Sequence, residues 1–268
     1  MTSSTLDLRT IRAVASDMDG VVWRGADILP GAVEFFQFLT QQGIPYVMAT
    51  NNSTKTVHDY VSRLRGLNIP AETSQIVSSI VVTGNDLRKQ YPAGTPIFVL
   101  GSEAIEAAMM ELGYVLDPDH AKVVVVGLDT RLTYERLKTA GRRILEGADF
   151  IGTNNDSSLP VSDGLNPGSG TMIAALRTMT GREPILMGKP QSTMFLTAVE
   201  RLGAPAANTL MIGDRLETDI KGAKEIGMAT ALVLTGVAEE DDDHAGYAPD
   251  AVFDDLAALL AQWKRDVL

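Results

Sequence analysis

Short runs of apolar residues alternate along the chain with longer segments in which apolar residues recur every three or four positions. The short runs have the length of buried β-strands, and the longer segments have the period of amphipathic helices. We predict seven strands from this pattern: Ala13–Ser16, Tyr46–Ala49, Ile97–Leu100, Val123–Val126, Ile185–Met187, Leu210–Ile212 and Ala231–Leu234. The four consecutive valines of Val123–Val126 are typical of a strand that is covered on both faces. This alternation of strands and helices predicts an α/β fold with a mainly parallel sheet.

The predicted helices have recognisable ends. One helix is predicted over Ala32–Gln42, with Pro30 near its start and Gly43 after its end. Two further helices are predicted to begin near Thr54 and near Ser192. The apolar stripe of the first helix consists of Phe35, Phe36 and Leu39. Four glycines that follow periodic segments are predicted to act as C-terminal helix caps: Gly66, Gly113, Gly203 and Gly227.

Two aspartates, Asp17 and Asp19, follow the first predicted strand. In an extended chain residues i and i+2 point to the same side, so both carboxylates can reach one small volume. Negative charges that close repel each other, and they persist only beside a cation or when one group keeps its proton. An Asp-x-Asp pattern alone also fits an ordinary acidic turn, so its meaning depends on the residues that follow the other strands.

Polar residues also follow the predicted strand Tyr46–Ala49. Thr50, Asn51 and Asn52 come directly after it and precede a predicted helix. Hydroxyl, amide and backbone N–H groups at a helix start form an anion site. The alternative is an ordinary helix N-cap, which Asn52 or Ser53 would serve well.

Two more strands lead into charged residues. Lys189 lies in a stiff Gly-Lys-Pro turn after Ile185–Met187, and Asp214 follows Leu210–Ile212 and a glycine. The alternative for Lys189 is a solvated surface lysine. Asp219 follows Asp214 in the same segment, and its alternative is a residue that caps or begins the next helix. Ligands of open α/β sheets bind beyond the carboxyl ends of the strands, so we expect these residues at one edge of the sheet. Carboxylates suit Mg²⁺, and a lysine with hydroxyl and amide donors suits a phosphate, which together equip a site for phosphoryl transfer.

Length and composition limit the classes of function. The chain has 268 residues, a formal net charge of −11 and no cysteine. The negative charge argues against nucleic acid and anionic membranes as partners, and the lack of cysteine excludes disulfides and thiolate metal sites. No apolar run is long enough to span a bilayer and the first seven residues lack a targeting signature, so we expect a cytoplasmic protein. His58, His120 and His244 lack metal-ligand spacing, and Glu239–Asp243 is expected to be a solvated loop.

These motifs together resemble those of the haloacid-dehalogenase-superfamily phosphatases, in the subfamily of 4-nitrophenylphosphatase, NagD-type and phosphoglycolate-phosphatase-type enzymes. The resemblance covers nearly the whole chain, and the order and spacing of the motifs make it specific. Its carriers are Asp17–Gly25, Pro30–Ala32, Ala49–Ser53, Gly188–Pro190 and Gly213–Asp219. The resemblance implies a Rossmann-like parallel-sheet core with an inserted α/β cap of the C2 type. The expected core is residues 1–83 and 185–268, and the expected cap is residues 84–184.

The resemblance also implies a reaction. The chain would be a Mg²⁺-dependent phosphomonoester hydrolase of small phosphorylated metabolites that acts through an aspartyl-phosphate. Asp17 would be the nucleophile, and Asp19 would act first as an acid and then as a base. Mg²⁺ would be held by Asp17, by the backbone carbonyl of Asp19 and by Asp214. Asp219 would orient metal-bound water or Lys189.

Further implied roles concern the phosphate and the partners. Thr50, the backbone at Asn51, and Asn52 would bind the phosphoryl oxygens, and Lys189 would offset negative charge there. The implied partner is a small-molecule phosphate ester, with a possible homodimer through the cap. Phosphoglycolate, sugar phosphates, nucleoside monophosphates, pyridoxal phosphate and glycerol phosphate all remain open as substrates. The alternatives are a phosphotransferase or mutase on the same fold, a non-catalytic phosphate-binding sensor, and a protein phosphatase.

Three other features give separate expectations. Gly164–Thr171 is expected to be a flexible loop that caps the next helix, rather than a dinucleotide-binding loop, because the third glycine and a preceding strand are missing. Together with Asn154–Asp156 it resembles the family's substrate-facing segment. Asp129 either faces the pocket or lies in a surface turn. Trp23 is expected to pack at the turn beside the site and to line its entrance.

Overall fold

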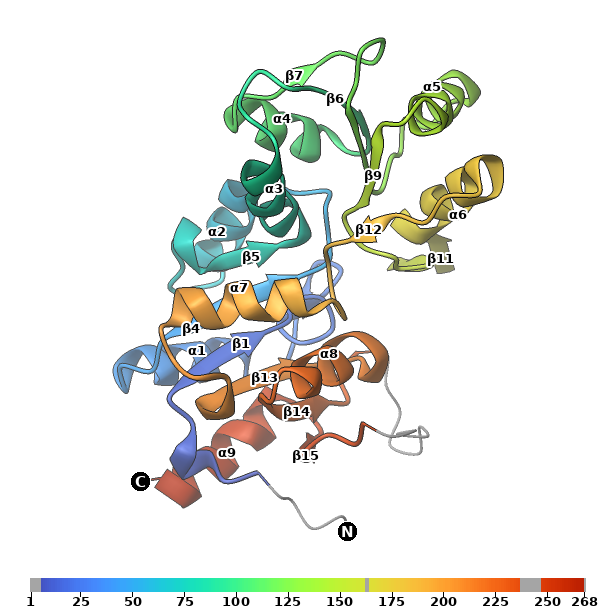
Figure 1. The fold of residues 1–268 in the computed structure, drawn as a ribbon. Helices are drawn as coiled ribbons and strands as arrows, with labels where there is room; N and C mark the ends of the chain where they lie inside the picture. The colour runs from blue at the N-terminus through green and yellow to red at the C-terminus, as the bar shows by residue number, and fades with distance from the viewer. Residues whose placement is uncertain (1–5, 162–163, 237–246, 268) are drawn as a thin grey trace. The chain divides into compact units, whose positions relative to one another are not determined.

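The computed structural model describes residues 6–161, 164–236 and 247–267, and its contacts divide the chain into two compact units (Figure 1). The core unit consists of Met1–Thr50, Val57–Val77 and Lys189–Leu268, and the inserted unit consists of Asn51–Thr56 and Ser78–Gly188. The predicted boundary at 83/84 falls within the helix α3 (Ser79–Gln90). Glu239–Asp243 and His244 lie outside the described residues.

The core unit is built on one large sheet. Its strands are β1 (Ala13–Ser16), β2 (Trp23–Arg24), β3 (Asp27–Ile28), β4 (Tyr46–Thr50), β5 (Ile76–Ser78), β13 (Thr209–Gly213), β14 (Ala229–Val233) and β15 (Ala251–Phe253). Its helices are α1 (Ala32–Gln41), α2 (Val57–Gly66), α7 (Ser192–Leu202), α8 (Lys221–Glu225) and α9 (Leu256–Val267), with a π-helical turn at Leu216–Ile220. Among the described residues, six strands form the sheet in the order β15-β14-β13-β1-β4-β5, and β2 pairs with β3 in a separate hairpin.

Strand β1 lies at the centre of the sheet and pairs in parallel with β13 and with β4. The chain builds the sheet outward from β1 in both directions, so the strand order reverses at this point. Ser16 of β1 pairs with Ile212 of β13, and therefore the residues after these two strands leave the sheet at the same edge. An edge of this kind, at the reversal of strand order, is where open α/β sheets bind ligands.

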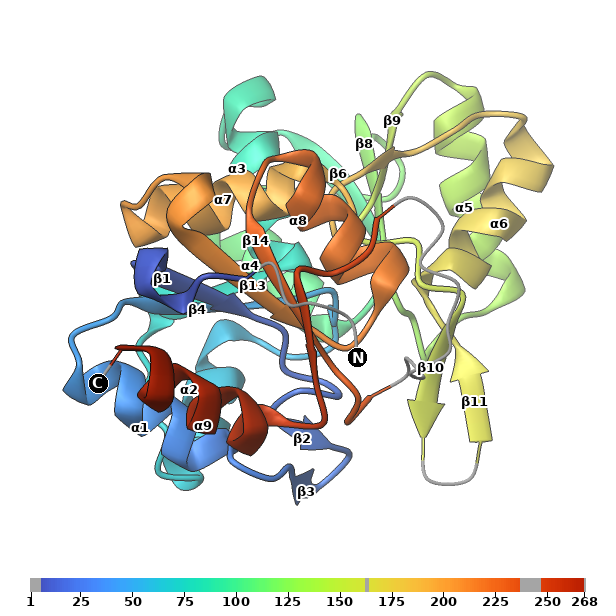
Figure 2. The ribbon, with the colours of Figure 1, turned by 90° about the horizontal axis from the view of Figure 1, so that it is seen from below.

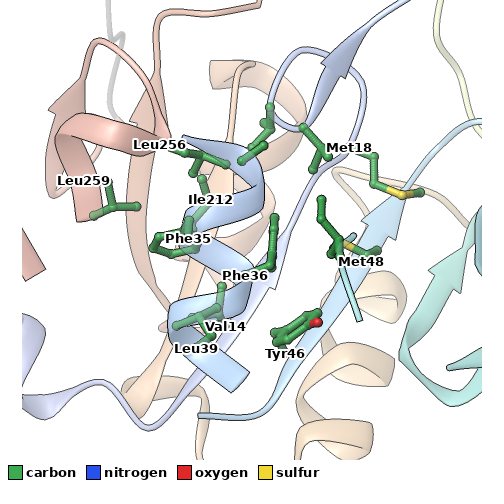
Figure 3. Packing of buried hydrophobic residues seen from close by; sticks show 14 of the residues in the cluster. Val14, Met18, Phe35, Phe36, Leu39, Tyr46, Met48, Ile212, Leu256 and Leu259 are labelled. Atoms are coloured by element: carbon green, nitrogen blue, oxygen red, sulfur yellow. The ribbon is translucent and has the colours of Figure 1, made fainter. Parts of the chain in front are cut away.

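Helices cover both faces of the core sheet (Figure 2). Helices α1, α2 and α9 pack on one face, and α7 and α8 lie on the other. The predicted stripe of α1 is confirmed, because Phe35, Phe36 and Leu39 are fully buried. Figure 3 shows these side chains on Val14 and Tyr46 of the sheet. Burial of one such side chain contributes roughly 1.5–3 kcal/mol to folding.

The predicted helix ends are partly confirmed. Gly43 and Gly203 have the left-handed backbone conformation after α1 and α7, with φ of 68° and 63°. Gly66 is instead the last residue of α2, and Asn68 takes the left-handed conformation with φ of 61°. Asparagine tolerates this conformation better than most other residues with a Cβ, so Asn68 takes the place that was predicted for Gly66. Helix α2 begins at Val57, three residues later than predicted.

The inserted unit contains a second parallel sheet. Its strands are β6 (Pro96–Leu100), β7 (Val115–Leu116), β8 (Val123–Val126), β9 (Asp149–Gly152), β10 (Ser158–Val161), β11 (Gly164–Pro167) and β12 (Ile185–Leu186). Its helices are α3, α4 (Glu103–Glu111), α5 (Tyr134–Leu145) and α6 (Ser169–Thr180). The sheet order is β12-β9-β8-β6-β7 with every pair parallel, and β10 and β11 form an antiparallel hairpin. The valines of β8 are fully buried, as predicted.

One segment of the inserted unit differs from its expected structure. Gly164–Pro167 is the strand β11 rather than a flexible loop, and Gly168 then precedes α6 without a side-chain cap. A Cβ at Gly168 would lie 2.1 Å from the backbone oxygen of Asp156, so the glycine permits a close approach of two backbones. Gly168 therefore allows the chain to pack closely beside the hairpin.

Candidate active site

Asp17 is the first residue after β1, and its side chain is buried. Its backbone N–H donates a hydrogen bond of 2.8 Å to the carbonyl of Ile212, which ties it to the neighbouring strand. The N–H of Met18 donates to Oδ1 of Asp17 at 2.7 Å. The carbonyl of Met18 then accepts a bond of 2.8 Å from Val22, which closes a tight turn after the aspartate. The turn therefore fixes the position of one Asp17 oxygen.

Lys189 lies within bonding distance of two carboxylates. Its Nζ is 3.0 Å from Oδ1 of Asp17 and 2.7 Å from Oδ1 of Asp219, and it donates a bond of 3.0 Å to the carbonyl of Ala49. The lysine is 3% exposed and Asp219 is fully buried. The alternative of a solvated surface lysine is therefore wrong.

The strand before Lys189 differs from the prediction. The segment that precedes it, β12, belongs to the sheet of the inserted unit and not to the sheet that contains β1. Lys189 instead enters the core unit just before α7, which packs on β1 and β4. A helix that connects parallel strands begins at the carboxyl edge of the sheet, so the residues before α7 arrive at the same edge as Asp17.

Burial and neighbouring charges shift the pKa values of this pair. Burial raises the pKa of Asp17 well above its usual range; the charge of Lys189 opposes this shift, and those of Asp219, Asp214 and Asp19 add to it. Burial on its own lowers the pKa of Lys189, but the charges of Asp17 and Asp219 outweigh it and the net shift is upward. The lysine is therefore firmly charged, whereas Asp17 is held in a strongly negative environment.

Two glycines allow the backbone to approach the Asp214 side chain closely, and Asp219 is held in a turn of its own. Asp214 follows β13 and is 1% exposed. A Cβ at Gly236 would lie 1.9 Å from its Oδ2, and a Cβ at Gly20 would lie 2.3 Å from the same atom. Asp219 lies in the π-helical turn, where its Oδ2 accepts a bond of 3.2 Å from the N–H of Arg215. The sequence predicted neither this turn nor the role of Gly236.

The donor set of this cluster fits a hard divalent cation. Asp17, Asp214 and Asp219 each offer a carboxylate oxygen, and these oxygens all lie within 4.8 Å of one another. Oxygen ligands are those that Mg²⁺ prefers. When ionised, the three buried carboxylates exceed the single ammonium charge of Lys189 by two. A divalent cation offsets that excess, and buried charges otherwise cost several kcal/mol each, as an order of magnitude.

Thr50 ends β4 at the same edge and is 1% exposed. Its hydroxyl is hydrogen-bonded to that of Tyr60, a buried residue of α2. Burial raises the pKa of Tyr60, and the charges of Asp19 and Asp17 raise it further. The phenol is therefore neutral and holds the threonine hydroxyl beside the carboxylates. Sequence reasoning missed Tyr60, because a tyrosine in an amphipathic helix is typical of an ordinary core residue.

Asp19 differs from Asp17 in exposure. Asp17 is buried, whereas Asp19 is exposed on the turn that follows. The indole Nε1–H of Trp23 donates a hydrogen bond of 2.9 Å to Oδ1 of Asp19. Trp23 packs at the turn as predicted, but it is fully buried and so lines no entrance.

Two predicted phosphate ligands belong to the inserted unit. Asn51 donates from Nδ2 to Oδ1 of Asp156 at 3.1 Å, and its carbonyl accepts a bond of 2.8 Å from Asn154. Oδ1 of Asn52 accepts bonds of 3.0 Å and 2.7 Å from the N–H and hydroxyl of Thr54, which closes a local turn. The alternative of Asn52 or Ser53 as the N-cap of α2 is wrong, because that helix begins at Val57. The roles of both asparagines toward a phosphate remain predictions.

Asp129 is neither in a surface turn nor free of contacts. It is 2% exposed and accepts a bond of 2.8 Å from Nε of Arg136 and another of 2.8 Å from the N–H of Arg131. All three residues lie in the inserted unit. Asp129 therefore joins α5 to the segment before it through an ion pair with Arg136 and a backbone hydrogen bond from Arg131.

Comparisons with known proteins show the family of this chain. One family model, described as haloacid dehalogenase-like hydrolase, matches residues 14–115, and another, HAD-hydrolase-like, matches residues 186–259. An acid sugar phosphatase of Staphylococcus aureus is 35% identical over 260 residues, which are 96% of this chain and 100% of the relative. The chain belongs to the haloacid-dehalogenase-like hydrolases.

Solved structures place the chain further within this family of hydrolases. A 4-nitrophenylphosphatase from Thermotoga maritima has a TM-score of 0.89 and 34% identity, over 96% of this chain and 98% of that one. NagD from E. coli K-12 has a TM-score of 0.85 and 29% identity, over 92% and 97%. The predicted fold, a Rossmann-like core with an inserted α/β cap, is therefore confirmed. The chain is a phosphatase of the haloacid-dehalogenase type.

No helix in the described part of the chain combines the length and the hydrophobicity that a bilayer crossing requires.

Proposed function

We propose that this haloacid-dehalogenase-type phosphatase is a Mg²⁺-dependent hydrolase of small phosphomonoesters that works through a phosphorylated Asp17. The observation that carries the proposal is the buried cluster of Asp17, Asp214 and Asp219, two of whose members bind Nζ of Lys189. A substrate phosphate brings more negative charge to this place. A site built for it needs fixed positive charge that acts on the phosphorus as it is attacked.

The metal would be held by Asp17, Asp214 and the backbone carbonyl of Asp19. Bound there, it would supply the charge that lets an anionic carboxylate approach an anionic phosphate. Asp219 has another role, because its Oδ1 contacts Lys189 and its Oδ2 accepts from the N–H of Arg215. These contacts support Asp219 as the residue that orients Lys189.

Asp17 would make the bond to phosphorus through Oδ2. Its Oδ1 is already engaged by the N–H of Met18 and by Lys189, which turns the other oxygen to the substrate. As the Asp17–phosphorus bond forms, the bond between phosphorus and the leaving oxygen breaks. Lys189 offsets charge on the nucleophile and on the phosphoryl group.

Asp19 would move the proton in both halves of the reaction. In the first half its carboxyl proton passes to the leaving oxygen, and the alcohol departs. In the second half the carboxylate takes a proton from water, whose oxygen bonds to phosphorus while the Asp17–phosphorus bond breaks. The exposure of Asp19 supports this role, because the leaving group of an in-line attack would lie on the side of the phosphate away from the buried Asp17. Such acid–base catalysis contributes roughly 10²- to 10⁴-fold.

Thr50 would hold the phosphoryl oxygens together with Lys189. The Thr50 hydroxyl is oriented by Tyr60, and Thr50 is the last residue of β4, which pairs directly with β1. The backbone at Asn51, and Asn52, would supply further donors. Pre-positioned donors of this kind stabilise charge as it develops and lose little free energy to reorganisation.

The substrate would be a small phosphate ester, with sugar phosphates as the first class to test. This choice rests on the name of the S. aureus relative, an acid sugar phosphatase, and on the 4-nitrophenylphosphatase among the solved structures. The inserted unit would select the leaving group and exclude water from the reaction. A homodimer through that unit and a cytoplasmic location remain predictions.

The test is turnover of 4-nitrophenyl phosphate and of a panel of sugar phosphates, with Mg²⁺ and then with a chelator. We expect inorganic phosphate to appear in step with substrate loss, and activity to disappear with the chelator and return with Mg²⁺. A mainly phosphorylated acceptor would make the chain a phosphotransferase or mutase. Binding of phosphate esters without turnover would make it a sensor.

A further inference from the structure

A fully buried tryptophan holds the exposed aspartate of the turn. Trp23 is 0% exposed, and its Nε1–H donates to Oδ1 of Asp19 at 2.9 Å. The N–H of Gly20 also donates to the carbonyl of Trp23 at 2.8 Å, so the two ends of the turn are joined by backbone as well as by side chain. An exposed carboxylate without such a contact samples several rotamers.

A cation on the ring and a paired backbone hold Trp23 in place. The guanidinium of Arg63 lies over the Trp23 ring, 3.8 Å from its centroid, and Nη2 of Arg63 donates to the carbonyl of Gly25. The backbone of Trp23 pairs with Ile28 in the β2–β3 hairpin, which fixes where the side chain leaves the chain. A guanidinium on an aromatic face is attracted to the ring, and more strongly where water is excluded. The donor is therefore fixed before it meets the carboxylate.

We propose that Trp23 is a positioning residue that sets which oxygen of Asp19 carries the transferred proton. An indole N–H only donates, so Oδ1 of Asp19 must accept from it. The proton that passes to the leaving group is then carried on Oδ2, and the same oxygen takes the proton from water in the second half. This inference rests on the proposed acid–base role of Asp19.

The helix that supplies Arg63 supports the assignment. Tyr60 and Arg63 lie three residues apart on α2, so both side chains project from the same side of that helix. Tyr60 holds the hydroxyl of Thr50, and Arg63 holds the ring of Trp23. One helix thus supports both a proposed phosphate ligand and the donor to the proposed acid.

The first test compares two leaving groups in a single turnover. An alkoxide needs a proton in order to leave, whereas 4-nitrophenolate leaves without one. In Trp23→Phe we expect release of glycerol from glycerol 2-phosphate to slow about 10- to 100-fold, a part of the full acid contribution. Release of 4-nitrophenolate should change by less than about threefold, because that step does not draw on the acid.

The chain offers a matched control in its other tryptophan. Trp263 is 1% exposed and packs against Phe35 in the core, so Trp263→Phe removes an equally buried indole. We expect it to slow both substrates equally or not at all. If Trp23→Phe behaves like Trp263→Phe, the inference is wrong.

Asp19→Asn separates this inference from the proposed function. If Asp19→Asn slows the alkyl ester no more than the nitrophenyl ester, the acid role of Asp19 fails and the inference fails with it. If Asp19→Asn shows the leaving-group effect and Trp23→Phe does not, only the inference fails. In the double variant we expect the rate of Asp19→Asn alone, because the indole acts only through that carboxylate. A further multiplicative loss would contradict the inference.

A spectroscopic test does not depend on the activity or folding of Trp23→Phe. The two indole N–H signals of ¹⁵N-labelled protein are assigned with Trp263→Phe. We expect Asp19→Asn to shift the Trp23 signal and to leave the Trp263 signal in place. An unmoved Trp23 signal would overturn the inference.

Discussion

Nζ of Lys189 lies 3.0 Å from Oδ1 of Asp17, and both side chains are buried at the carboxyl edge of the core sheet. The two residues are 172 positions apart in the sequence, and the fold brings them together through β1 and the start of α7. The contact fixes one oxygen of the carboxylate and supplies positive charge where a phosphate would arrive. The contact therefore contributes both to the stability of the core unit and to its proposed chemistry.

The nucleophile assignment predicts the effect of Asp17→Asn. An amide in this position does not form the phosphorylated intermediate, so kcat should fall by about 10⁴-fold or more. The protein should remain folded, because the change removes one charge from a crowded acidic cluster. Steady-state assays and circular dichroism melting check both points, with Asp27→Asn at an exposed position as the control. Near-normal turnover would rule out the assignment.

Lys189→Met should cost both activity and stability. The change leaves Asp17 and Asp219 buried without their ammonium partner, and loss of one member of a buried pair costs about 3–5 kcal/mol. Added Mg²⁺ should restore part of this loss, because it binds the folded cluster and not the unfolded chain. Urea unfolding with and without the ion measures the effect, and Lys122→Met at an exposed position is the control. An unchanged midpoint would show that the lysine does not compensate the cluster.

Removal of the Asp214 side chain should weaken Mg²⁺ binding in a calorimetric titration. A subtler variant, Gly236→Ala, keeps every carboxylate but places a Cβ 1.9 Å from Oδ2 of Asp214. Displacement of that ligand should weaken Mg²⁺ affinity by about 10- to 100-fold. Gly66→Ala, where a Cβ meets no atom within 4 Å, should leave the affinity unchanged. Equal affinities in the two glycine variants would mean that Asp214 is not a ligand.

A separate ionic contact predicts a dependence of stability on pH. Asp250 accepts bonds from Nζ of Lys224 at 2.7 Å and from the N–H of Thr230 at 2.9 Å. Burial alone would raise the pKa of Asp250, but these bonds outweigh it and the pKa is lowered. Its contribution to the free energy of unfolding is therefore full above the aspartate pKa of the unfolded chain, about 3.9, and is lost as pH falls through the lower folded value.

Asp250→Asn should accordingly lower the free energy of unfolding by about 1–2 kcal/mol near neutral pH. The difference from the parent protein should vanish under strongly acidic conditions, where both chains lack the charge. Denaturant unfolding across the pH range measures it, with the exposed Asp254→Asn as the control. A difference that persists unchanged at low pH would contradict the ionic origin of the effect.

The parts of the fold that the sequence predicted are those with strong local signals. The four valines of β8 and the apolar stripe of α1 were both found, because their burial pattern repeats over enough residues to be recognised. The start of α7 at Ser192 was found because a proline marks it. Short strands such as β9 and β12 carry only two to four residues, and the sheet to which each belongs depends on distant pairing.

The residues of the candidate site could be predicted where polar residues directly follow a buried strand. Asp17 and Asp214 stand out because nothing in local structure requires an acid there. Tyr60 and Gly236 do not stand out, since their roles come from which side chains the fold brings opposite them. The bond from Trp23 to Asp19 had a signal in the four-residue spacing, but only the turn around Met18 makes the two side chains meet.

The most direct test of the central claim is to trap the phosphorylated enzyme. The protein is mixed with Mg²⁺ and excess 4-nitrophenyl phosphate, quenched in acid and digested, and the peptide that contains Asp17 is examined by mass spectrometry. We predict a phosphate group on Asp17 that is missing in Asp17→Asn and in the presence of a chelator. Full turnover with no phosphate on that peptide, or with the phosphate on another residue, would contradict the account.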